Sequence, residues 1–329
     1  MNIQSSNPSA ASAAPPPAPF GARGPLRVGL VQESADADRG VNVERARQRI
    51  REAARQGAQL VCLQELFATP YFCQIEDATR FDLSEPLDGP TIRAIADVAQ
   101  EESVVVVASV FERRAPGLHH NTAVVLGPEG QSLGIYRKMH IPDDPQYHEK
   151  FYFAPGDLGF TAIDTPYGPI ASLVCWDQWY PEAARIAALR GARVLFYPTA
   201  IGWLPEDEEP HGAAQLSAWQ TMQRSHAIAN GVFVVAVNRV GVERSEAGQI
   251  RFWGHSFVAD PHGVVLAEAG ESEELLVVDC DLQKIDEARR GWPFLRDRRI
   301  DAYAGLTSRW LGDGAGGGGS GGGGAGGHG

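Results

Sequence analysis

Short apolar runs alternate with helically spaced apolar residues along most of the chain. The runs that predict strands lie at residues 26–32, 58–63, 104–111, 170–174, 192–197 and 232–238. Apolar residues recur at helical spacing in residues 43–54, 90–101, 182–190 and 213–230. The run at 104–111 is too continuously apolar for a half-exposed strand, which favours a strand covered on both faces. This alternation of strand and helix is typical of an α/β protein built from βαβ units.

Two pairs of shorter runs predict β-hairpins, because turn residues join their arms. Residues 121–126 and 132–137 flank Gly-Pro-Glu-Gly, and residues 255–259 and 264–267 flank Asp-Pro-His-Gly. With a final strand at 275–278, the chain divides into two βαβ-type halves, each with a hairpin. We therefore predict an α/β fold in which two sheets pack face to face with helices outside, a four-layer αββα sandwich. A single doubly wound sheet is the alternative.

Three reactive side chains stand where predicted strands end: Glu65, Lys138 and Cys175. The strand before Cys175 stops at the thiol, and Pro181 occupies the first turn of the following helix. This placement brings the sulfur near the free N–H groups of a helix start, where a thiolate or an oxyanion is favoured. Position alone does not distinguish a nucleophile from a small buried cysteine, or Lys138 from a solvated lysine at a strand end.

Composition narrows the classes of function. The 329 residues are 43% hydrophobic, enough for one large domain, and a net charge of -12 disfavours a nucleic-acid partner, which needs clustered Lys and Arg. Four scattered cysteines form no C-x-x-C pair, so we expect no disulfides and a cytoplasmic location. No apolar run of about eighteen residues predicts a membrane span. The histidines lack zinc-like spacing, so no metal is expected.

Both ends of the chain differ in composition from its middle. Residues 1–24 are rich in Ala, Pro and Ser and lack the basic start and apolar core of a signal peptide, so we expect a disordered leader. Residues 312–329 are almost entirely glycine, which predicts a flexible tail. The folded domain is expected to span residues 25–311.

The three reactive residues lie in motifs that resemble those of the nitrilase superfamily, the carbon-nitrogen hydrolases. Glu65 stands in Leu-Gln-Glu-Leu, Lys138 in Tyr-Arg-Lys-Met-His-Ile-Pro, and Cys175 in Val-Cys-Trp-Asp. The resemblance covers residues 26–304, with the three motifs in the superfamily's order. It implies an αββα sandwich of the nitrilase type, a catalytic trio of these residues, a small-molecule substrate, no cofactor and a homo-oligomer.

Longer strings narrow the resemblance within the superfamily. Residues 148–153, 175–185, 196–202 and 294–299 are similar to the branch that hydrolyses N-carbamoylputrescine. Two departures are His148, where plant relatives are expected to carry an acidic residue, and the stretch 203–211, whose composition differs. The resemblance implies hydrolysis of a carbamoylated diamine to putrescine, ammonia and carbon dioxide through a carbamoyl-cysteine, as part of polyamine biosynthesis.

The resemblance also implies a role for each residue of the site. Cys175 attacks the carbamoyl carbon, and Glu65 takes the thiol proton and later activates water. Lys138 and the backbone N–H after Cys175 hold the oxyanion. Glu149 matches a second glutamate of the superfamily and would orient Lys138 or the leaving nitrogen, the alternative being a surface carboxylate.

Further residues are candidates for the substrate pocket. Tyr71, Trp176 and Thr199 are expected to line or support it, although Trp176 could instead pack in the core. An amine-ended substrate needs an acidic pocket end, for which Glu206 and Asp207 on a predicted loop are candidates; a solvated acidic turn is the alternative. A β-ureidopropionase or ω-amidase acting on a carboxylate-ended substrate is a competing function, and a non-catalytic binding module is another.

Overall fold

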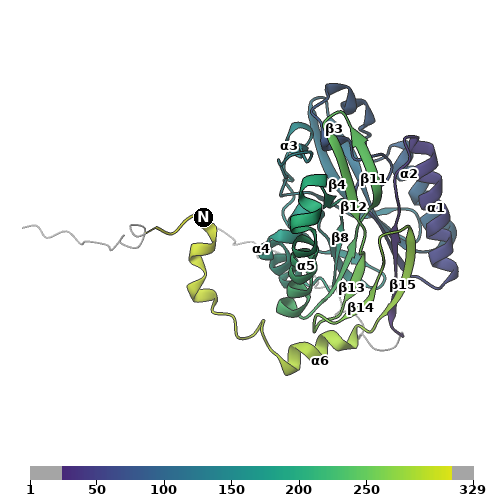
Figure 1. The fold of residues 1–329 in the computed structure, drawn as a ribbon. Coiled ribbons are helices and arrows are strands. Elements are labelled where there is room, and N and C mark those ends of the chain that lie inside the picture. Colours follow the sequence, from purple (N-terminus) through teal and green to yellow (C-terminus); the bar gives the residue numbers. More distant parts are fainter. Residues whose placement is uncertain (1–23, 313–329) are drawn as a thin grey trace, which may run out of the picture.

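Two six-stranded sheets form the centre of the molecule (Figure 1). The computed structural model describes residues 24–312, so the expected leader and glycine-rich tail lie, but for one residue each, outside the described part. The first sheet has the strand order β15 (Glu274–Cys280), β1 (Leu26–Gln32), β2 (Leu60–Leu63), β3 (Val105–Ala115), β4 (Leu118–Leu126), β5 (Ser132–Arg137). The second has the order β14 (Val265–Glu268), β13 (Phe257–Ala259), β10 (Phe233–Val237), β8 (Val194–Pro198), β7 (Gly168–Ser172), β6 (Ile163–Thr165).

Each half of the chain builds one sheet in the same way. In the first sheet β1, β2 and β3 are parallel, and β4 and β5 follow as an antiparallel hairpin. In the second, β7, β8 and β10 are parallel, and β13 and β14 form the hairpin. The last strand, β15, returns to pair antiparallel with β1, with Leu26 opposite Cys280. The two βαβ-type halves predicted from the sequence are therefore confirmed.

Helices cover the outer face of each sheet and complete four layers (Figure 1). The α-helices are α1 (Arg39–Arg55), α2 (Pro90–Glu102), α3 (Glu149–Tyr152), α4 (Pro181–Leu189), α5 (Pro205–Asn230) and α6 (Gln283–Gly291). Ile50 of α1 and Ile95 of α2 pack on the first sheet, while Ala187 of α4 and Trp219 of α5 pack on the second. A separate apolar cluster from both sheets fills the space between them. The αββα sandwich is confirmed, and a single doubly wound sheet is excluded.

The start of α5 corrects one prediction. Residues 203–211 were expected to form a loop ahead of a helix at 213–230, but α5 already begins at Pro205. Proline suits a first helical position because the N–H that it lacks would have no partner within the helix there. The acidic residues Glu206, Asp207 and Glu208 fall in the first turn, where the positive end of the helix stabilises carboxylates.

A small third sheet was not predicted from the sequence. It has the order β11 (Val240–Ser245), β12 (Gly248–Trp253), β9 (Gly202–Trp203). Phe252 of this sheet packs with Tyr71 and Leu204 in an apolar cluster of its own. Short 3₁₀ turns lie at Phe72–Gln74, Ala78–Leu83, Cys175–Trp179, Ile300–Ala302 and Ala304–Thr307.

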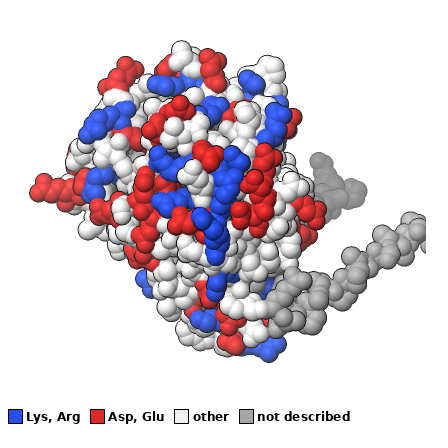
Figure 2. All heavy atoms as spheres, turned by 90° about the vertical axis from the view of Figure 1, so that its right-hand side faces the viewer, with Lys and Arg blue, Asp and Glu red and all other residues white. Residues whose placement is uncertain are grey.

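The face that includes α1 and β15 carries charges of both signs side by side (Figure 2). Ion pairs cross it between elements, as in Arg27 with Asp279 and Arg51 with Glu101. Exposed pairs of this kind add little to stability, and they leave the face without a field of a single sign. No helix in the described residues combines the length and the apolar character needed to cross a membrane.

The segment after α6, residues 292–311, leads away from the sheets and runs past α4 (Figure 1). We call it the C-terminal arm. Several of its large apolar side chains are exposed, including Trp310 at 84% and Ile300 at 74%. Such a series of exposed apolar side chains on one segment is unusual for the surface of a monomer.

Candidate active site

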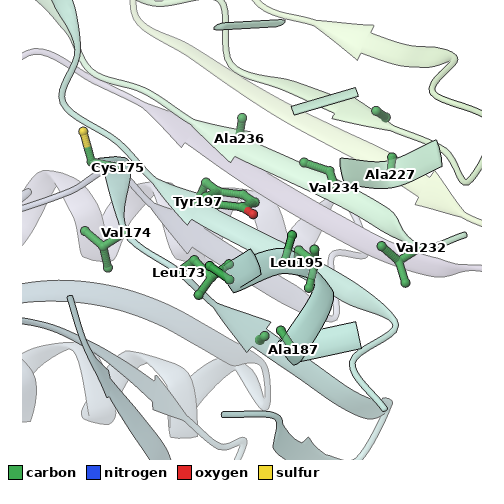
Figure 3. Packing of buried hydrophobic residues seen from close by; sticks show 14 of the residues in the cluster. Leu173, Val174, Cys175, Ala187, Leu195, Tyr197, Ala227, Val232, Val234 and Ala236 are labelled. Carbon is green, nitrogen blue, oxygen red and sulfur yellow. The ribbon is translucent and has the colours of Figure 1, made fainter. Parts of the chain in front are cut away.

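Cys175 lies at a sharp bend between a strand and a helix. β7 ends at Ser172, a single 3₁₀ turn runs from Cys175 to Trp179, and Pro181 begins α4. Cys175 has a φ of 40°, in the left-handed region that non-glycine residues rarely adopt. This conformation costs about 1–3 kcal/mol, and residues held in it cluster at functional sites. Figure 3 shows Cys175 at one end of an apolar cluster, with its sulfur pointing away from the other labelled side chains.

The carboxylate of Asp177 holds this bend together. It accepts hydrogen bonds from the backbone N–H of Val174 at 2.9 Å, from the backbone N–H of His140 at 3.0 Å and from the hydroxyl of Tyr136 at 2.8 Å. Asp177 is completely buried, so these bonds satisfy a charge that would otherwise be strongly disfavoured. They connect the bend at Cys175 to the segment that carries Lys138.

Gln178 fixes the other side of the bend to α5. Its side-chain oxygen accepts hydrogen bonds from Trp219 at 2.7 Å and Gln223 at 2.9 Å, both on α5. The hydroxyl of Thr199 donates to the backbone oxygen of Tyr197 at 2.9 Å and lies 3.3 Å from the same Gln178 oxygen. Thr199, predicted to line or support the pocket, is fully buried behind the bend. Its observed contacts are those of a supporting residue.

Lys138 connects two buried carboxylates. Its Nζ lies 2.9 Å from Oε1 of Glu65 and 2.6 Å from Oε2 of Glu149. The ammonium and both carboxylates are almost fully excluded from solvent. Lys138 is therefore not a solvated strand-end lysine, and Glu149 is not a surface carboxylate.

Tyr71 completes this cluster from the side of Glu149. Its hydroxyl donates a hydrogen bond of 2.8 Å to Oε1 of Glu149, and its side chain is buried. Its ring lies 5.5 Å, centre to centre, from that of Tyr147, which the sequence did not single out. Trp176 is half-buried next to the thiol and meets Trp179 edge to face, with ring centres 6.5 Å apart.

The ionisable groups around the Cys175 sulfur shift one another's pKa values. Burial, and next the Glu65 carboxylate, raise the pKa of the Cys175 thiol well above its usual value, although Lys138 opposes them. Burial would lower the pKa of Lys138, but Glu149 and Glu65 outweigh it and raise that pKa. Burial also raises the pKa of Glu149 to about 7, against the opposing effect of Lys138. The four groups thus share one buried site.

Burial of the Cys175 thiol opposes its ionisation, and the Glu65 carboxylate acts in the same direction. The expected effect of the free N–H groups of the helix start on a thiolate stays a prediction. A pKa so raised keeps the Cys175 thiol protonated near neutral pH. A base must therefore remove its proton before the sulfur can attack.

The acidic candidates for the far end of the pocket lie on α5. Glu206 is exposed and Asp207 is half-buried. Their neighbour Glu208 is paired with Arg251, which itself stacks on the ring of Trp203 at 4.6 Å. No contact in the structure joins Glu206 or Asp207 to the group around Cys175, so their role stays a prediction.

Sequence reasoning missed two residues that hold Glu65. Asn121 on β4 donates a hydrogen bond of 2.7 Å from its side-chain nitrogen to Oε1 of Glu65. The buried Arg239 donates to the backbone oxygens of Glu65 at 2.9 Å and of Leu66 at 3.0 Å. Both residues follow or interrupt apolar strand runs, and a polar residue within such a run was the available signal. Among the described residues, no cluster of three or more His, Cys, Asp or Glu side chains could hold a metal ion.

Comparison with known proteins gives consistent matches. Residues 27–290 match the family model described as carbon-nitrogen hydrolase. The chain is 45% identical to the N-carbamoylputrescine amidase of Solanum tuberosum, over 86% of this chain and 95% of that protein. Its structure resembles the crystal structure of a carbon-nitrogen hydrolase from Helicobacter pylori G27, with a TM-score of 0.85 and 48% identity over 87% of this chain and 99% of that one.

A more distant solved structure is informative about the cysteine. A mutant of the amidase from Nesterenkonia sp. AN1 is 27% identical to this chain and has a TM-score of 0.67, over 88% of this chain and 97% of that one. In that structure the acetamide moiety of fluoroacetamide is added covalently at the active site cysteine.

Proposed function

The chain belongs to the carbon-nitrogen hydrolases of the nitrilase superfamily, and from this premise we propose that it hydrolyses N-carbamoylputrescine to putrescine, ammonia and carbon dioxide. The observation that carries the proposal is the buried cluster of Glu65, Lys138 and Glu149, whose charges all act on the Cys175 thiol. The identity to a relative of that activity supports the choice of substrate. The product would supply polyamine biosynthesis.

In the first half of the reaction, Cys175 becomes carbamoylated. Glu65 takes the thiol proton, and the thiolate attacks the carbonyl carbon of the ureido group. Lys138 and the backbone N–H of Trp176 stabilise the negative oxygen of the tetrahedral intermediate. The proton on Glu65 then passes to the terminal nitrogen, the carbon–nitrogen bond breaks, and ammonia leaves. Glu149 holds the ammonium of Lys138 in place through their contact of 2.6 Å.

In the second half, water releases the carbamoyl group. Glu65 takes a proton from the water molecule as its oxygen attacks the carbonyl carbon. The intermediate collapses, the carbon–sulfur bond breaks, and the sulfur recovers its proton from Glu65. The carbamate that departs decomposes to carbon dioxide and the free amine. Each step uses only side chains and backbone groups of this chain.

A carboxylate-ended substrate would need an unpaired cation, and Lys138 is already held by Glu65 and Glu149. Arg239 is the buried arginine beside Glu65, and its two terminal nitrogens already donate to four protein oxygens. It is therefore committed to the protein and is not free to bind a substrate carboxylate. Asp207 is the better placed of the two acidic candidates for the distal ammonium, because it is half-buried and Glu206 is exposed.

Ammonia release by the purified protein tests the function. We expect faster release from N-carbamoylputrescine than from N-carbamoyl-β-alanine, and none from either with the Cys175→Ser variant. Cys280→Ser, which changes a buried thiol outside the site, is the matched control and should keep the activity. Faster turnover of the carboxylate-ended compound would replace our choice of substrate. Hydrolysis that survives Cys175→Ser would overturn the mechanism.

We also propose that the protein forms a homo-oligomer through its C-terminal arm. A buried aromatic side chain covers about 150–250 Å². Covering the exposed apolar side chains of the arm would thus bury on the order of 800 Å², one partner's share of a standard interface. A second copy of the chain, offering its own arm in exchange, would satisfy both arms at once. The scattered free thiols favour a cytoplasmic location for this assembly.

A further inference from the structure

We propose that Asn121 is a positioning residue that decides which oxygen of Glu65 receives the thiol proton. The inference rests on the proposed function, because it takes Glu65 to be the base of that reaction. Asn121 is completely buried on β4 and reaches the carboxylate directly.

The two oxygens of Glu65 have different surroundings. Oε1 accepts two hydrogen bonds, from the side-chain nitrogen of Asn121 at 2.7 Å and from Nζ of Lys138 at 2.9 Å. Oε2 is buried and has no hydrogen-bond partner within the described part of the chain. A buried carboxylate oxygen without a partner calls for an explanation, and a catalytic role is one of them.

A chain of hydrogen bonds fixes the orientation of the Asn121 amide. The backbone N–H of Leu66 donates to the hydroxyl oxygen of Ser109 at 3.2 Å. The single hydroxyl proton of Ser109 is donated to the side-chain oxygen of Asn121 at 3.0 Å. The amide oxygen of Asn121 is therefore occupied, and its NH₂ group must face Glu65.

This chain begins and ends at neighbouring residues. It starts at the N–H of Leu66, which has a φ of 48°, and returns through Ser109 and Asn121 to the side chain of Glu65. The closed ring locks the side chain of Glu65 to its own backbone. The carboxylate cannot turn over without breaking a buried hydrogen bond.

The two carboxylate oxygens of Glu65 therefore have different roles. Oε1 faces only donors, so a proton placed there would displace a hydrogen bond from Asn121 or Lys138. Oε2 is the one oxygen that can take a proton without that loss. Asn121 thereby directs proton transfer from Cys175, and later from water, to Oε2.

Substitution of Asn121 and Ser109 tests this role, with a buried neighbour as control. Asn121→Ala removes the donor to Oε1, and Ser109→Ala leaves that donor in place but frees the amide to rotate. Thr122→Val is the matched control, because Thr122 is the next residue of β4, is equally buried, and also donates to a buried carboxylate, that of Glu112. Asn121→Ala and Ser109→Ala each lose two buried hydrogen bonds and should lose similar thermal stability, whereas Thr122→Val loses one and should lose less.

The readouts are the pH profile of ammonia release and the rate of iodoacetamide labelling of Cys175. We expect Asn121→Ala to lower kcat by about 10- to 100-fold with little change in KM, the range for one hydrogen bond to a charged group. The acidic limb of its profile should move to higher pH, since an ionised carboxylate has lost a donor. Ser109→Ala should change kcat and the acidic limb in the same directions as Asn121→Ala, but by less. Thr122→Val should change neither kcat nor the pH profile.

Two results would overturn the inference. One is a wild-type kcat and pH profile in the folded Asn121→Ala and Ser109→Ala variants, and the other is an equal loss in Thr122→Val. If Asn121→Ala does not fold, Ser109→Ala decides the question alone. If the wild-type protein does not release ammonia from N-carbamoylputrescine, the proposed function fails. The labelling of Cys175 then still tests whether Asn121 controls the base.

Discussion

Nζ of Lys138 lies 2.6 Å from Oε2 of Glu149, with both groups out of contact with solvent. An ammonium buried this deeply is tolerated only because carboxylates lie against it. The same contact fixes the position of the ammonium within the buried group around Cys175. Stability and the proposed catalysis therefore depend on one interaction, and substitutions can separate the two contributions.

Removing the cation should destabilise the protein. Lys138→Met leaves Glu65 and Glu149 buried without a positive partner, so we expect the free energy of unfolding to fall by about 3–5 kcal/mol. Urea denaturation measures it, and activity should be lost. Adding Glu149→Gln to this variant should recover part of the stability, because one of the unpaired charges is gone. A loss in the double variant equal to the sum of the losses in Lys138→Met and Glu149→Gln alone would show that the two residues are not coupled.

The raised pKa of Glu149 predicts a specific pH dependence of stability. Its pKa is about 7 in the folded protein against an ordinary value of 4.5, so between these values the folded state binds a proton that the unfolded state has released. This contribution to stability is full below about pH 4.5 and is lost as the pH rises through 7. Glu149→Gln carries no such proton, so its stability relative to the wild type should rise by about 1–3 kcal/mol between pH 5 and pH 8.

Urea unfolding of both proteins at the two pH values checks this prediction. Glu76→Gln, at an exposed carboxylate outside the site, serves as the control and should show no such trend. A stability difference between wild type and Glu149→Gln that is the same at pH 5 and pH 8 would contradict the titration assigned to Glu149.

Asp177 should be essential to the bend that carries the nucleophile. Asp177→Ala leaves the N–H groups of Val174 and His140 and the hydroxyl of Tyr136 without their acceptor. Each buried donor left unpaired costs about 1–3 kcal/mol, so we expect a loss of about 3–5 kcal/mol and a lower kcat. Thermal unfolding and ammonia release measure the two effects. Asp164→Ala, at an exposed strand position, is the control. A loss of stability in Asp177→Ala no greater than that in the control would count against the role of Asp177 in holding the bend.

The C-terminal arm should set the oligomeric state. Replacing both Leu306 and Trp310 with serine removes two exposed apolar side chains that we place in the interface. We expect the variant to be smaller than the wild type in light scattering coupled to size-exclusion chromatography, with its fold intact by circular dichroism. Leu158→Ser changes an exposed leucine elsewhere and should not alter the mass. A monomeric wild-type protein would refute the role of the arm.

Most of the fold followed from hydrophobic periodicity, because both sheets are covered on both faces. A strand such as β10 has only buried residues and reads as a continuous apolar run. The third sheet was not predicted because buried and exposed residues alternate irregularly along β11, so its sequence shows no strand periodicity. The start of α5 was misjudged because prolines and a run of acids suggested a loop, although both residue types suit a first helical turn.

The site was only partly predictable, for a different reason. The motifs singled out Glu65, Lys138 and Cys175 as candidates, and the structure places the first two in direct contact. Asn121 lies within β4, where a polar residue in a strand run signals a buried polar group but does not identify its partner. Its importance depends on a partner 56 positions earlier in the chain, and only the folded structure reveals that pairing.

Apart from β15, which joins the first sheet, the two sheets come from different halves of the chain, and the proposed reacting groups lie on both. Glu65 and Lys138 follow strands of the first sheet, while Cys175 follows a strand of the second. The packing of the apolar layer between the sheets thus sets the distance between these groups. A misplacement of about 1 Å between reacting atoms can cost a hundredfold in rate. A substitution in that layer, far from any charged residue, could therefore abolish activity while each sheet kept its own structure.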